Sequence, residues 1–304
     1  MSTLRQLTYL VALSDYRNFR RAADAAHISQ PTLSQQVRAL EARLGATLVE
    51  RNASPVEFTP VGREVVARAR KILLEVKDIE DLARRSKVGL SGTIRFGITP
   101  TLGPYLMPAI VASLHRRFPD MRLYIREGIP DEQARELARG ELDMLLTPLP
   151  VLGSNLHIEP LFREPLHIVA PPEHPVSQAA LVRRLDLAGL GFLSLDHRHH
   201  AHRQIRDICE DLGAELLENY EGTSLDSLRQ MCGSGLGLAI LPELYLRSEV
   251  GGVDMVTRLA LADWSASRSI AAVWREGVAY ADSYQIIAEA IAVEARRILA
   301  YPLK

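Results

Sequence analysis

The sequence of 304 residues has few of the side chains that build covalent or metal-based frameworks. Cysteine occurs only twice, at Cys209 and Cys232, and no CxxC pair is present. This count excludes a disulfide framework and a cysteine-based zinc module, and we expect Cys232 to be a buried, small apolar residue. No apolar run approaches the roughly 18 residues that a membrane span requires. The first 19 residues lack the pattern of a signal peptide, so we expect a cytoplasmic location without membrane association.

Charge is distributed unevenly, although the net charge of the whole chain is only −1. Residues 1–90 contain 15 Lys/Arg against 10 Asp/Glu, which gives +5, whereas residues 91–304 contain 21 against 27, which gives −6. A basic amino-terminal third on an acidic body indicates a small module that binds a polyanion. The length predicts about two domains of ordinary size.

Three short helices are expected in the first 45 residues. Apolar residues recur at helical spacing over residues 2–14 and again over residues 31–44, and the intervening helix over residues 19–27 is rich in alanine. Ser29 is a good N-cap for the third helix, and Gly45 is a typical end. The short connection between the second and third helices predicts a helix-turn-helix.

The third helix has a polar outer face. Gln and Arg can make bidentate contacts to adenine and guanine edges, and Ser and Thr reach bases or phosphates. A solvated face of an ordinary helical bundle is the alternative. Two strands at residues 47–50 and 56–59, joined by a turn at 51–55, would form a β-wing with Arg51 at its tip, near a phosphate or the minor groove. The candidate DNA-binding residues are Ser29, Gln30, Pro31, Thr32, Ser34, Gln35, Arg38 and Arg51.

The run FRRAADAAHISQPTLSQQVRALEARLGATLVERN, followed by FTPVGREVVARARKIL, resembles the amino-terminal domain of LysR-type transcriptional regulators. The resemblance implies an α/β protein with a winged helix-turn-helix, a long linker helix and a two-lobed effector-binding domain like a periplasmic binding protein. The expected parts are the DNA-binding domain at 1–59, the linker helix at 60–88, and the effector-binding domain at 92–304, with lobe I at about 92–160 and 266–304 and lobe II at about 161–265.

The linker segment carries an apolar seam with spacings of four and three residues. The seam consists of Val65, Ala69, Ile72, Val76, Ile79 and Ala83. Such a heptad pattern favours a two-stranded helix pair, and a homodimer would present two reading helices to two half-sites. Packing of the seam on its own domain is the alternative. Additional lobe contacts would give a homotetramer, and Gly89-Leu90-Ser91-Gly92 is typical of a hinge.

From Gly92 onward, strands and helices alternate. Strands at 93–98, 121–127 and 142–146 enclose helices at 104–117 and 130–139, which predicts a mostly parallel sheet covered by helices. The pattern then predicts strands at 156–159, 166–169, 191–195, 218–220, 238–242, 255–258 and 269–273, and helices at 185–188, 199–212, 224–234 and 279–299.

Within the LysR family, the strings ITPTLGPYLMPAI and GTSLDSLRQMCGSGLGLAILP resemble the peroxide-sensing OxyR-like subgroup. There, a peroxidatic cysteine follows a histidine at the start of a lobe II helix, and a second cysteine lies nine residues on. An ungapped match places His199 at that histidine, His200 at the peroxidatic cysteine and Cys209 at the second cysteine. Thr101 matches one active-site threonine, whereas Pro130 replaces another. Since histidine cannot form a sulfenic acid, we expect no thiol-based peroxide sensing.

Fold logic predicts where an effector binds. Ligands of open α/β sheets lie at the carboxyl ends of strands, where helix N-termini favour a carboxylate or another anion. We therefore expect a small, anionic effector between the two lobes, with helix capping as the alternative role of the threonines. The candidate effector residues are Thr99, Thr101, Pro148, His199, His200, Thr223 and Ser224.

Four of the nine histidines lie within residues 197–202. Imidazoles suit transition metals, but adjacent residues on a helix point apart. A solvated basic loop, a proton-sensitive pocket, and a metal site on His197, His199 and His202 are the three interpretations. We expect neither a metal nor another cofactor.

Three classes of function compete. The motifs HExxH and GxSxG are absent, and no glycine-rich phosphate loop follows a strand, which disfavours an enzyme. The amino-terminal module disfavours a solute-binding protein. We expect a non-enzymatic transcriptional regulator that binds double-stranded promoter DNA and a small effector, with RNA polymerase as a further partner. A metal-dependent enzyme or metal sensor on residues 197–202 is the alternative.

Overall fold

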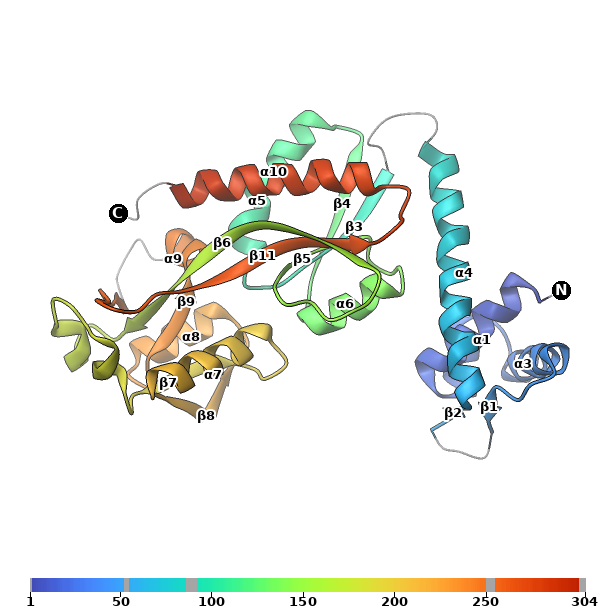
Figure 1. Cartoon of the computed structure of the whole chain (residues 1–304), viewed down its shortest axis with the longest axis horizontal. Helices are drawn as coiled ribbons and strands as arrows, with labels where there is room; N and C mark the ends of the chain where they lie inside the picture. The colour runs from blue at the N-terminus through green and yellow to red at the C-terminus, as the bar shows by residue number, and fades with distance from the viewer. Residues whose placement is uncertain (1, 52–54, 86–91, 250–254, 301–304) are drawn as a thin grey trace. The chain divides into compact units, whose positions relative to one another are not determined.

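The computed structural model describes most of the chain and divides into two compact units, residues 1–87 and residues 88–304 (Figure 1). The described ranges are residues 2–51, 55–85, 92–249 and 255–300, without the side chains of residues 78, 81–85 and 92. Across these ranges, no helix is both long enough and apolar enough to cross a membrane.

The first unit opens with the three expected helices, α1 (Leu4–Tyr16), α2 (Phe19–Ala25) and α3 (Gln30–Leu44). The predicted N-cap is confirmed, because the Ser29 side chain accepts a hydrogen bond from the Thr32 N–H. Gly45 ends α3 in the left-handed region, at φ 64°. The first helix runs two residues beyond its predicted end, because the chain breaks only at Arg17, which has φ 45°.

The helices of the first unit enclose one apolar core. Its fully buried members include Leu10, Leu13, Leu33, Val37 and Leu40, and the two alanines Ala22 and Ala23 of α2. Small side chains let α2 approach its neighbours closely. The core therefore takes the apolar face of α3 and leaves its polar face outside.

Two short strands, β1 (Val49–Glu50) and β2 (Glu57–Phe58), pair antiparallel beside these helices. They confirm a β-wing but are shorter than predicted, and residues 52–54 of its turn lie outside the described residues. The Thr59 hydroxyl accepts a hydrogen bond of 2.9 Å from the Gly62 N–H, which caps the start of α4 (Pro60–Arg85).

Helix α4 uses only part of its apolar seam within the first unit. Ala69 is buried and Val65 is half-buried against the core. By contrast, Ile72 is 46% exposed and Ile79 is 65% exposed. Packing on its own domain thus covers the beginning of the seam and leaves these two isoleucines uncovered. The side chain of Ala83, and residues 89–91 of the expected hinge, lie outside the described residues.

The second unit begins with the expected alternation. Strand β3 (Gly92–Ile98) pairs in parallel with β4 (Met121–Glu127) and with β5 (Met144–Pro148). Helices α5 (Gly103–Arg117) and α6 (Pro130–Ala138) connect them. This arrangement confirms the βαβαβ pattern and its parallel sheet.

Two long antiparallel strands, β6 (Leu156–Ala170) and β11 (Ala266–Arg275), extend this sheet. We predicted two separate strands in place of β6, and this was wrong. The register shifts once, beside Pro160, and the pairing then continues through Pro165 opposite Ser267. In the sequence, the two prolines interrupt the alternation of apolar and polar residues that is typical of a strand. In the structure, a β-bulge beside Pro160 accommodates this irregularity, so β6 continues as one strand.

The remaining strands of the large sheet pair with the far part of β6. They are β9 (Ala239–Pro242) and β10 (Thr257–Arg258), and the strand order is β10-β6-β11-β5-β3-β4 with β9 attached to β6. A separate parallel pair, β7 (Gly191–Leu195) and β8 (Glu215–Gly222), forms the second sheet of this unit.

The other helices of the second unit are α7 (His200–Leu212), α8 (Leu225–Gly233), α9 (Glu243–Glu249) and α10 (Ala281–Ala300). Two short 3₁₀ helices, η1 (Pro175–Gln178) and η2 (Arg184–Leu187), precede β7. Helix α9 and η1 were not predicted, because each is too short to show a helical period. In addition, α9 directly follows Pro242, and η1 begins at Pro175.

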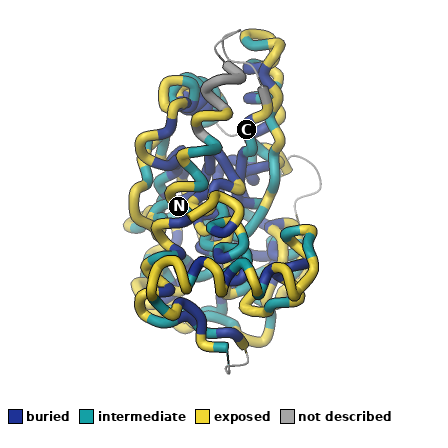
Figure 2. The backbone as a smooth tube through the Cα atoms, turned by 90° about the vertical axis from the view of Figure 1, so that its right-hand side faces the viewer, coloured by how far each residue is buried: buried dark blue, intermediate teal, exposed yellow. Residues whose placement is uncertain are grey.

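Separate apolar cores give the second unit its two lobes. Helices α5 and α10 cover one face of the large sheet around Phe96 and Trp274, and α6 covers the other face (Figure 1). A further core around Phe192 lies between α7, β7 and the far part of β6. Buried stretches alternate with exposed ones along the backbone, and many outer helical turns are exposed (Figure 2). The long strands β6 and β11 pass from one lobe into the other.

The junction between the wing and α4 yields a stability prediction. A Cβ atom on Gly62 would lie 2.0 Å from the backbone oxygen of Leu48, so the Gly62→Ala variant must displace either β1 or the start of α4. We expect a loss of about 1–3 kcal/mol in the free energy of unfolding, as for overpacked sites. Denaturant unfolding would measure it, with Val61→Ala at the exposed neighbouring position as the control. Equal stability of the two variants would contradict the close contact.

Candidate functional site

The polar face of α3 is accessible on the first unit. Ser29, Gln30, Pro31, Thr32, Gln35 and Arg38 are exposed, and Ser34 is half-buried. At the start of the helix, the hydroxyls of Ser29 and Thr32 lie 2.7 Å apart. The helix thus offers a row of amide, hydroxyl and guanidinium groups of the kind that read base edges.

Arg51 lies at the start of the predicted turn, directly after β1. Its guanidinium does not extend from the wing but donates to a Glu41 carboxylate oxygen at 2.7 Å and to the Ser34 hydroxyl at 3.3 Å. It also lies 5.6 Å from the centroid of the Phe19 ring. The other Glu41 oxygen accepts the N–H groups of Leu48 and Val49. Arg51 is thus paired with an acidic residue of α3 that faces β1, and its contact with DNA stays a prediction.

The charge state of Glu41 supports this role. Burial alone would raise its pKa, but the hydrogen bonds from Arg51 and from the two N–H groups of β1 lower it below the usual value. Glu41 is therefore a carboxylate that joins α3 to the wing. Arg51 balances this carboxylate and reaches the half-buried hydroxyl of Ser34.

Sequence analysis missed a second basic surface on the first unit. An open hollow is lined by the residues between α1 and α2, by Gln30 of α3 and by Pro55 and Val56. Its arginines are Arg17, Arg20 and Arg21; Arg17 pairs with Glu57 at 3.3 Å, and Arg21 lies over the Tyr16 ring. The three closely spaced arginines around Asn18 were a visible signal that the motif search did not use.

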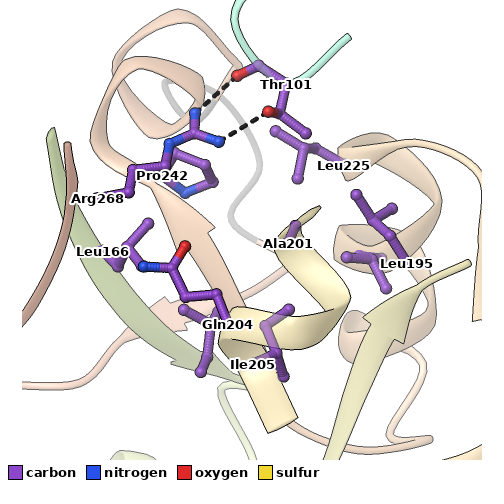
Figure 3. A pocket seen from close by; sticks show the side chains of 11 residues that line it. Thr101, Leu166, Leu195, Ala201, Gln204, Ile205, Leu225, Pro242 and Arg268 are labelled. Atoms are coloured by element: carbon purple, nitrogen blue, oxygen red, sulfur yellow. Dashed lines mark hydrogen bonds between the residues drawn. The ribbon is translucent and has the colours of Figure 1, made fainter. Parts of the chain in front are cut away.

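In the second unit, a small cavity lies where β6, β9, α7, α8 and the loop after β3 meet (Figure 3). Its volume is about 20 Å³, which accommodates about one water-sized molecule. Its walls are mainly apolar, and its polar side chains come from Thr101, Gln204 and Arg268. The lining residues are Thr101, Leu166, Leu195, Ala201, Gln204, Ile205, Leu225, Leu228, Ile240, Pro242 and Arg268.

A buried ion pair forms one wall of this cavity. The Arg268 guanidinium donates to the Glu164 carboxylate at 2.8 Å, to the Thr101 hydroxyl at 2.7 Å and to the Thr101 carbonyl at 3.0 Å. The other Glu164 oxygen accepts the Leu244 N–H at 2.9 Å. Both charged side chains are almost completely buried. The pair places hydrogen-bond donors at the cavity without a net charge.

The predicted effector residues are only partly gathered here. Thr101 lines the cavity, and Thr99 is buried next to it, with 3.5 Å between the two hydroxyls. Pro148 is buried at the end of β5. Thr223 and Ser224 are exposed, and Ser224 caps α8 by accepting the Ser227 N–H at 3.1 Å. Of the seven predicted residues, six do not line the cavity, because side chains of α7 and β11 fill the space between the strand ends and helix N-termini.

The sequence analysis did not predict the other two polar residues of the cavity, Gln204 and Arg268. Gln204 lies on α7, and its amide donates to the Ser267 carbonyl at 3.3 Å. Arg268 lies between Ser267 and Ser269, just before the apolar part of β11, so its local sequence does not indicate a paired, buried charge. Both residues come from segments that the fold brings to Thr101 from more than 100 positions away.

The two histidines at the start of α7 differ in environment. His199 is the N-cap residue and is half-buried, and its side chain makes no capping hydrogen bond. His200 is 8% exposed, and its Nδ1 has no hydrogen-bond partner among the described residues. Burial lowers the pKa of both imidazoles below the usual value. Both side chains are therefore mostly neutral at pH 7.

The expected metal alternative receives no support from the histidines. His202 Nδ1 lies 3.2 Å from the Ser194 hydroxyl and 3.1 Å from the Leu195 carbonyl. Within the described ranges, the only group of three side chains with ligand atoms close enough for a metal is Asp196, His197 and Glu221. His199 and His202 are not members of it, and Asp196 already accepts three hydrogen bonds from Arg198.

A polar contact joins the beginnings of α6 and α7. The Arg203 guanidinium donates to the two Asp131 oxygens at 2.8 Å and 3.3 Å. Asp131 follows Pro130 in the first turn of α6, and the hydrogen bond from Arg203 lowers the pKa of its carboxyl. This ion pair connects the two lobes beside His200.

Both cysteines are buried and free. Cys209 lies on α7 and Cys232 on α8, in different apolar cores. Burial raises the pKa of Cys209 to about 11 and that of Cys232 to about 12. Because the thiolate is the reactive form, neither thiol is activated in this arrangement.

Comparisons with known proteins agree with both units. Residues 4–63 match the family described as "Bacterial regulatory helix-turn-helix protein, lysR family", and residues 87–283 match "LysR substrate binding domain". The chain is 39% identical over 289 residues to the DNA-binding transcriptional dual regulator OxyR of Escherichia coli K12, covering 95% of this chain and 94% of that protein. It is 36% identical over 297 residues to the hydrogen peroxide-inducible genes activator of Haemophilus influenzae, with 97% and 98% covered.

Solved structures give the same result. A full-length OxyR variant from Pseudomonas aeruginosa has a TM-score of 0.73 at 32% identity, covering 96% of this chain and 95% of that one. A hydrogen peroxide-bound OxyR mutant from Corynebacterium glutamicum has a TM-score of 0.67 at 27% identity, with 99% and 94% covered. Together with the helix-turn-helix, the wing and the two-lobed body, these matches show that the chain belongs to the LysR family, in its OxyR-like group, and is a DNA-binding transcriptional regulator and not an enzyme.

Proposed function

We propose that α3 enters the major groove of promoter DNA and reads bases with Gln30, Thr32, Gln35 and Arg38. The observation that supports this is the row of exposed polar side chains on α3, opposite a fully apolar inner face. Ser29 and Pro31 fix the start of the helix and lie next to the same surface. Arg20 at the start of α2 is exposed and would contact a phosphate, which positions the module without reading sequence.

In this proposal, Ser34 and Arg51 contribute to DNA binding by helping to position the wing relative to α3. Arg51 is paired with Glu41 and holds the Ser34 hydroxyl at 3.3 Å. The pair orients the wing relative to α3, so its loss would move both DNA-contacting elements. Ser34 keeps enough exposure to reach the DNA backbone.

We propose that the exposed part of the α4 seam forms a homodimer with a second copy of the chain. Ile72 and Ile79 are large apolar side chains that the first unit leaves uncovered, and Val76 between them is half-buried. A two-stranded helix pair would bury all three. Contacts between effector-binding units of different dimers would then give the homotetramer.

We propose that the effector is a small, polar molecule that binds at the Thr101–Gln204–Arg268 cavity. The size of the cavity supports a molecule with few atoms, or a larger one only after the lobes open. Because Glu164 neutralises Arg268, the cavity favours an uncharged hydrogen-bonding molecule over the anion that the helix N-termini suggest. No observation in the described residues favours the metal-dependent alternative.

The proposed response differs from that of the relatives whose names mention hydrogen peroxide. The residue match places His200 where they would carry the reactive cysteine, and the two thiols present are buried and not activated. We propose regulation without thiol oxidation. Binding to promoter DNA implies a cytoplasmic location and a contact with RNA polymerase at the promoter.

The reading helix yields a test of the DNA contacts. Thr32→Ala and Gln35→Ala should each reduce discrimination between operator and unrelated DNA by about 1–3 kcal/mol for a good base contact. Arg20→Ala should weaken binding to all sequences and flatten the dependence on salt, because it removes a phosphate contact. Fluorescence anisotropy with the protein's own promoter region at several salt concentrations would separate these effects. Thr8→Ala, on α1, is the control, and equal binding by all four variants would remove the assignment.

The seam of α4 yields a test of assembly. Ile79→Glu places a carboxylate on the most exposed of the described seam positions, where it costs the single chain little but would be buried without a partner in the helix pair. We expect a shift to monomers, or to assemblies held only by the effector-binding units, in sedimentation velocity. Lys71→Glu, an exposed change outside the seam, should keep the native assembly. The same oligomer for both variants would show that the seam is not the interface.

The cysteines yield a test of the non-thiol response. Peroxide treatment should leave DNA affinity unchanged in the wild type, in Cys209→Ser and in Cys232→Ser, because neither buried thiol forms the reactive thiolate. Gel shifts before and after peroxide, with mass spectrometry of both cysteines, would measure this. A wild-type response that either serine variant abolishes would contradict the proposal.

A further inference from the structure

We propose that His200 makes the effector-binding unit sensitive to protons: the neutral imidazole allows the start of α7 to dock on α6, and the protonated imidazole weakens that contact between the lobes. This inference goes beyond the small-molecule effector proposed above. It rests on the proposed function only for its link to DNA binding.

The geometry places His200 at the contact itself. It is the first residue of α7, it is buried with 8% exposure, and its Nδ1 finds no hydrogen-bond partner among the described residues. Three residues later, Arg203 bridges to Asp131 in the first turn of α6. A buried imidazole therefore lies beside the ion pair that joins the two lobes.

The charged groups that act on His200 come from three elements. Helix α7 contributes Arg203 and Asp207, α6 contributes Asp131, and β11 contributes Arg268. Asp131 is already paired with Arg203, and Arg268 is already paired with Glu164. Asp207 is exposed and lies on the solvent side of α7. A positive charge on His200 would therefore meet two cations, without an acidic group reserved for it.

The position of His200 at the start of a helix further disfavours its protonation. His200 lies in the first turn of α7, where the N-terminal end of the helix dipole is unfavourable for a cation. Burial, with Arg203 and Arg268, lowers the pKa of His200 despite the opposing effect of Asp131 and Asp207. All these observations favour the neutral imidazole in the docked state.

The sign of the pH effect follows from linkage. Near pH 7.5, His200 is neutral whether or not α7 is docked, so the contact has its full strength. As the pH falls below about 6.5, the ordinary pKa of histidine, an undocked His200 takes up a proton before a docked one does. Acid therefore shifts the equilibrium toward the undocked start of α7, until the pH also falls below the lowered pKa of the docked state.

Undocking of the start of α7 would also change the effector cavity. Ala201 and Gln204, on the same first turns of α7, line the cavity beside Thr101 and Arg268. A movement of these turns changes the wall of the cavity and the contact between the lobes together. Protons and the small molecule would thus act on the same element of the protein.

Hydrogen–deuterium exchange of the full-length protein tests the proposal. Wild type and His200→Gln are compared at the same pH, so intrinsic exchange rates cancel, and peptides that cover residues 196–212 are measured at pH 7.5 and pH 5.5. We expect equal exchange at pH 7.5. At pH 5.5, wild type should exchange measurably faster than His200→Gln, because only wild type can take up a proton at this position. Equal exchange at both pH values would overturn the proposal.

Two controls keep the result decisive. His197→Gln removes an exposed histidine from the same segment and should keep the acid response. His200→Ser is a second variant that cannot titrate, for use if His200→Gln is less stable at pH 7.5. An acid response that persists in both His200 variants would assign the effect to another group and overturn the proposal.

DNA affinity measured by anisotropy over the same pH range tests the link to regulation. We expect a pH-dependent change in wild type and His197→Gln that is absent in His200→Gln. If acid opens α7 without changing DNA affinity, the link is wrong. If the protein binds no DNA at any pH, the proposed function fails, whereas the exchange experiment still decides whether His200 is the proton-sensitive group.

Discussion

The buried ion pair of Glu164 and Arg268 lies directly across the two long strands that connect the lobes, and several other elements depend on it. Through Thr101, Arg268 holds the loop after β3; through the Leu244 N–H, Glu164 holds the start of α9. Two buried charges are costly unless every polar atom is satisfied, and breaking such a pair commonly costs about 3–5 kcal/mol. A pair with this cost and these partners fixes the path of β6 and β11 and, with it, the distance between the lobes.

The same principle organises the smaller unit. Glu41 accepts two N–H groups from β1 and the guanidinium of Arg51, so one carboxylate sets the wing against the reading helix. In both units, an acidic side chain of one element satisfies backbone donors of another and is balanced by an arginine. The apolar cores hold each unit together, whereas these two networks set how the wing lies against α3 and how β6 lies against β11.

Much of the fold follows from the sequence, because short-range physics determines it. The cap at Ser29, the end of α3 at Gly45 and the βαβαβ order needed only local patterns. The errors arose where distant residues decide the outcome. Pro160 and Pro165 suggested a broken strand, yet β11 pairs with β6 from Leu156 to Leu166, past both prolines. The cavity likewise depends on Arg268 reaching Thr101 across 167 positions, which no local pattern contains.

The start of α7 shows how a single residue can change the chemistry of a contact between the two lobes. A thiol at this position would be small and uncharged when buried, and its reactivity would depend on an activated thiolate. An imidazole is larger and gains a charge near neutrality, so the same burial opposes its protonation. In this chain, His200 occupies that position between Asp131, Arg203 and Arg268, all of which are already paired. The Arg203–Asp131 contact joins the lobes beside this imidazole, and under the proposal made above proton uptake is the chemical event that weakens it.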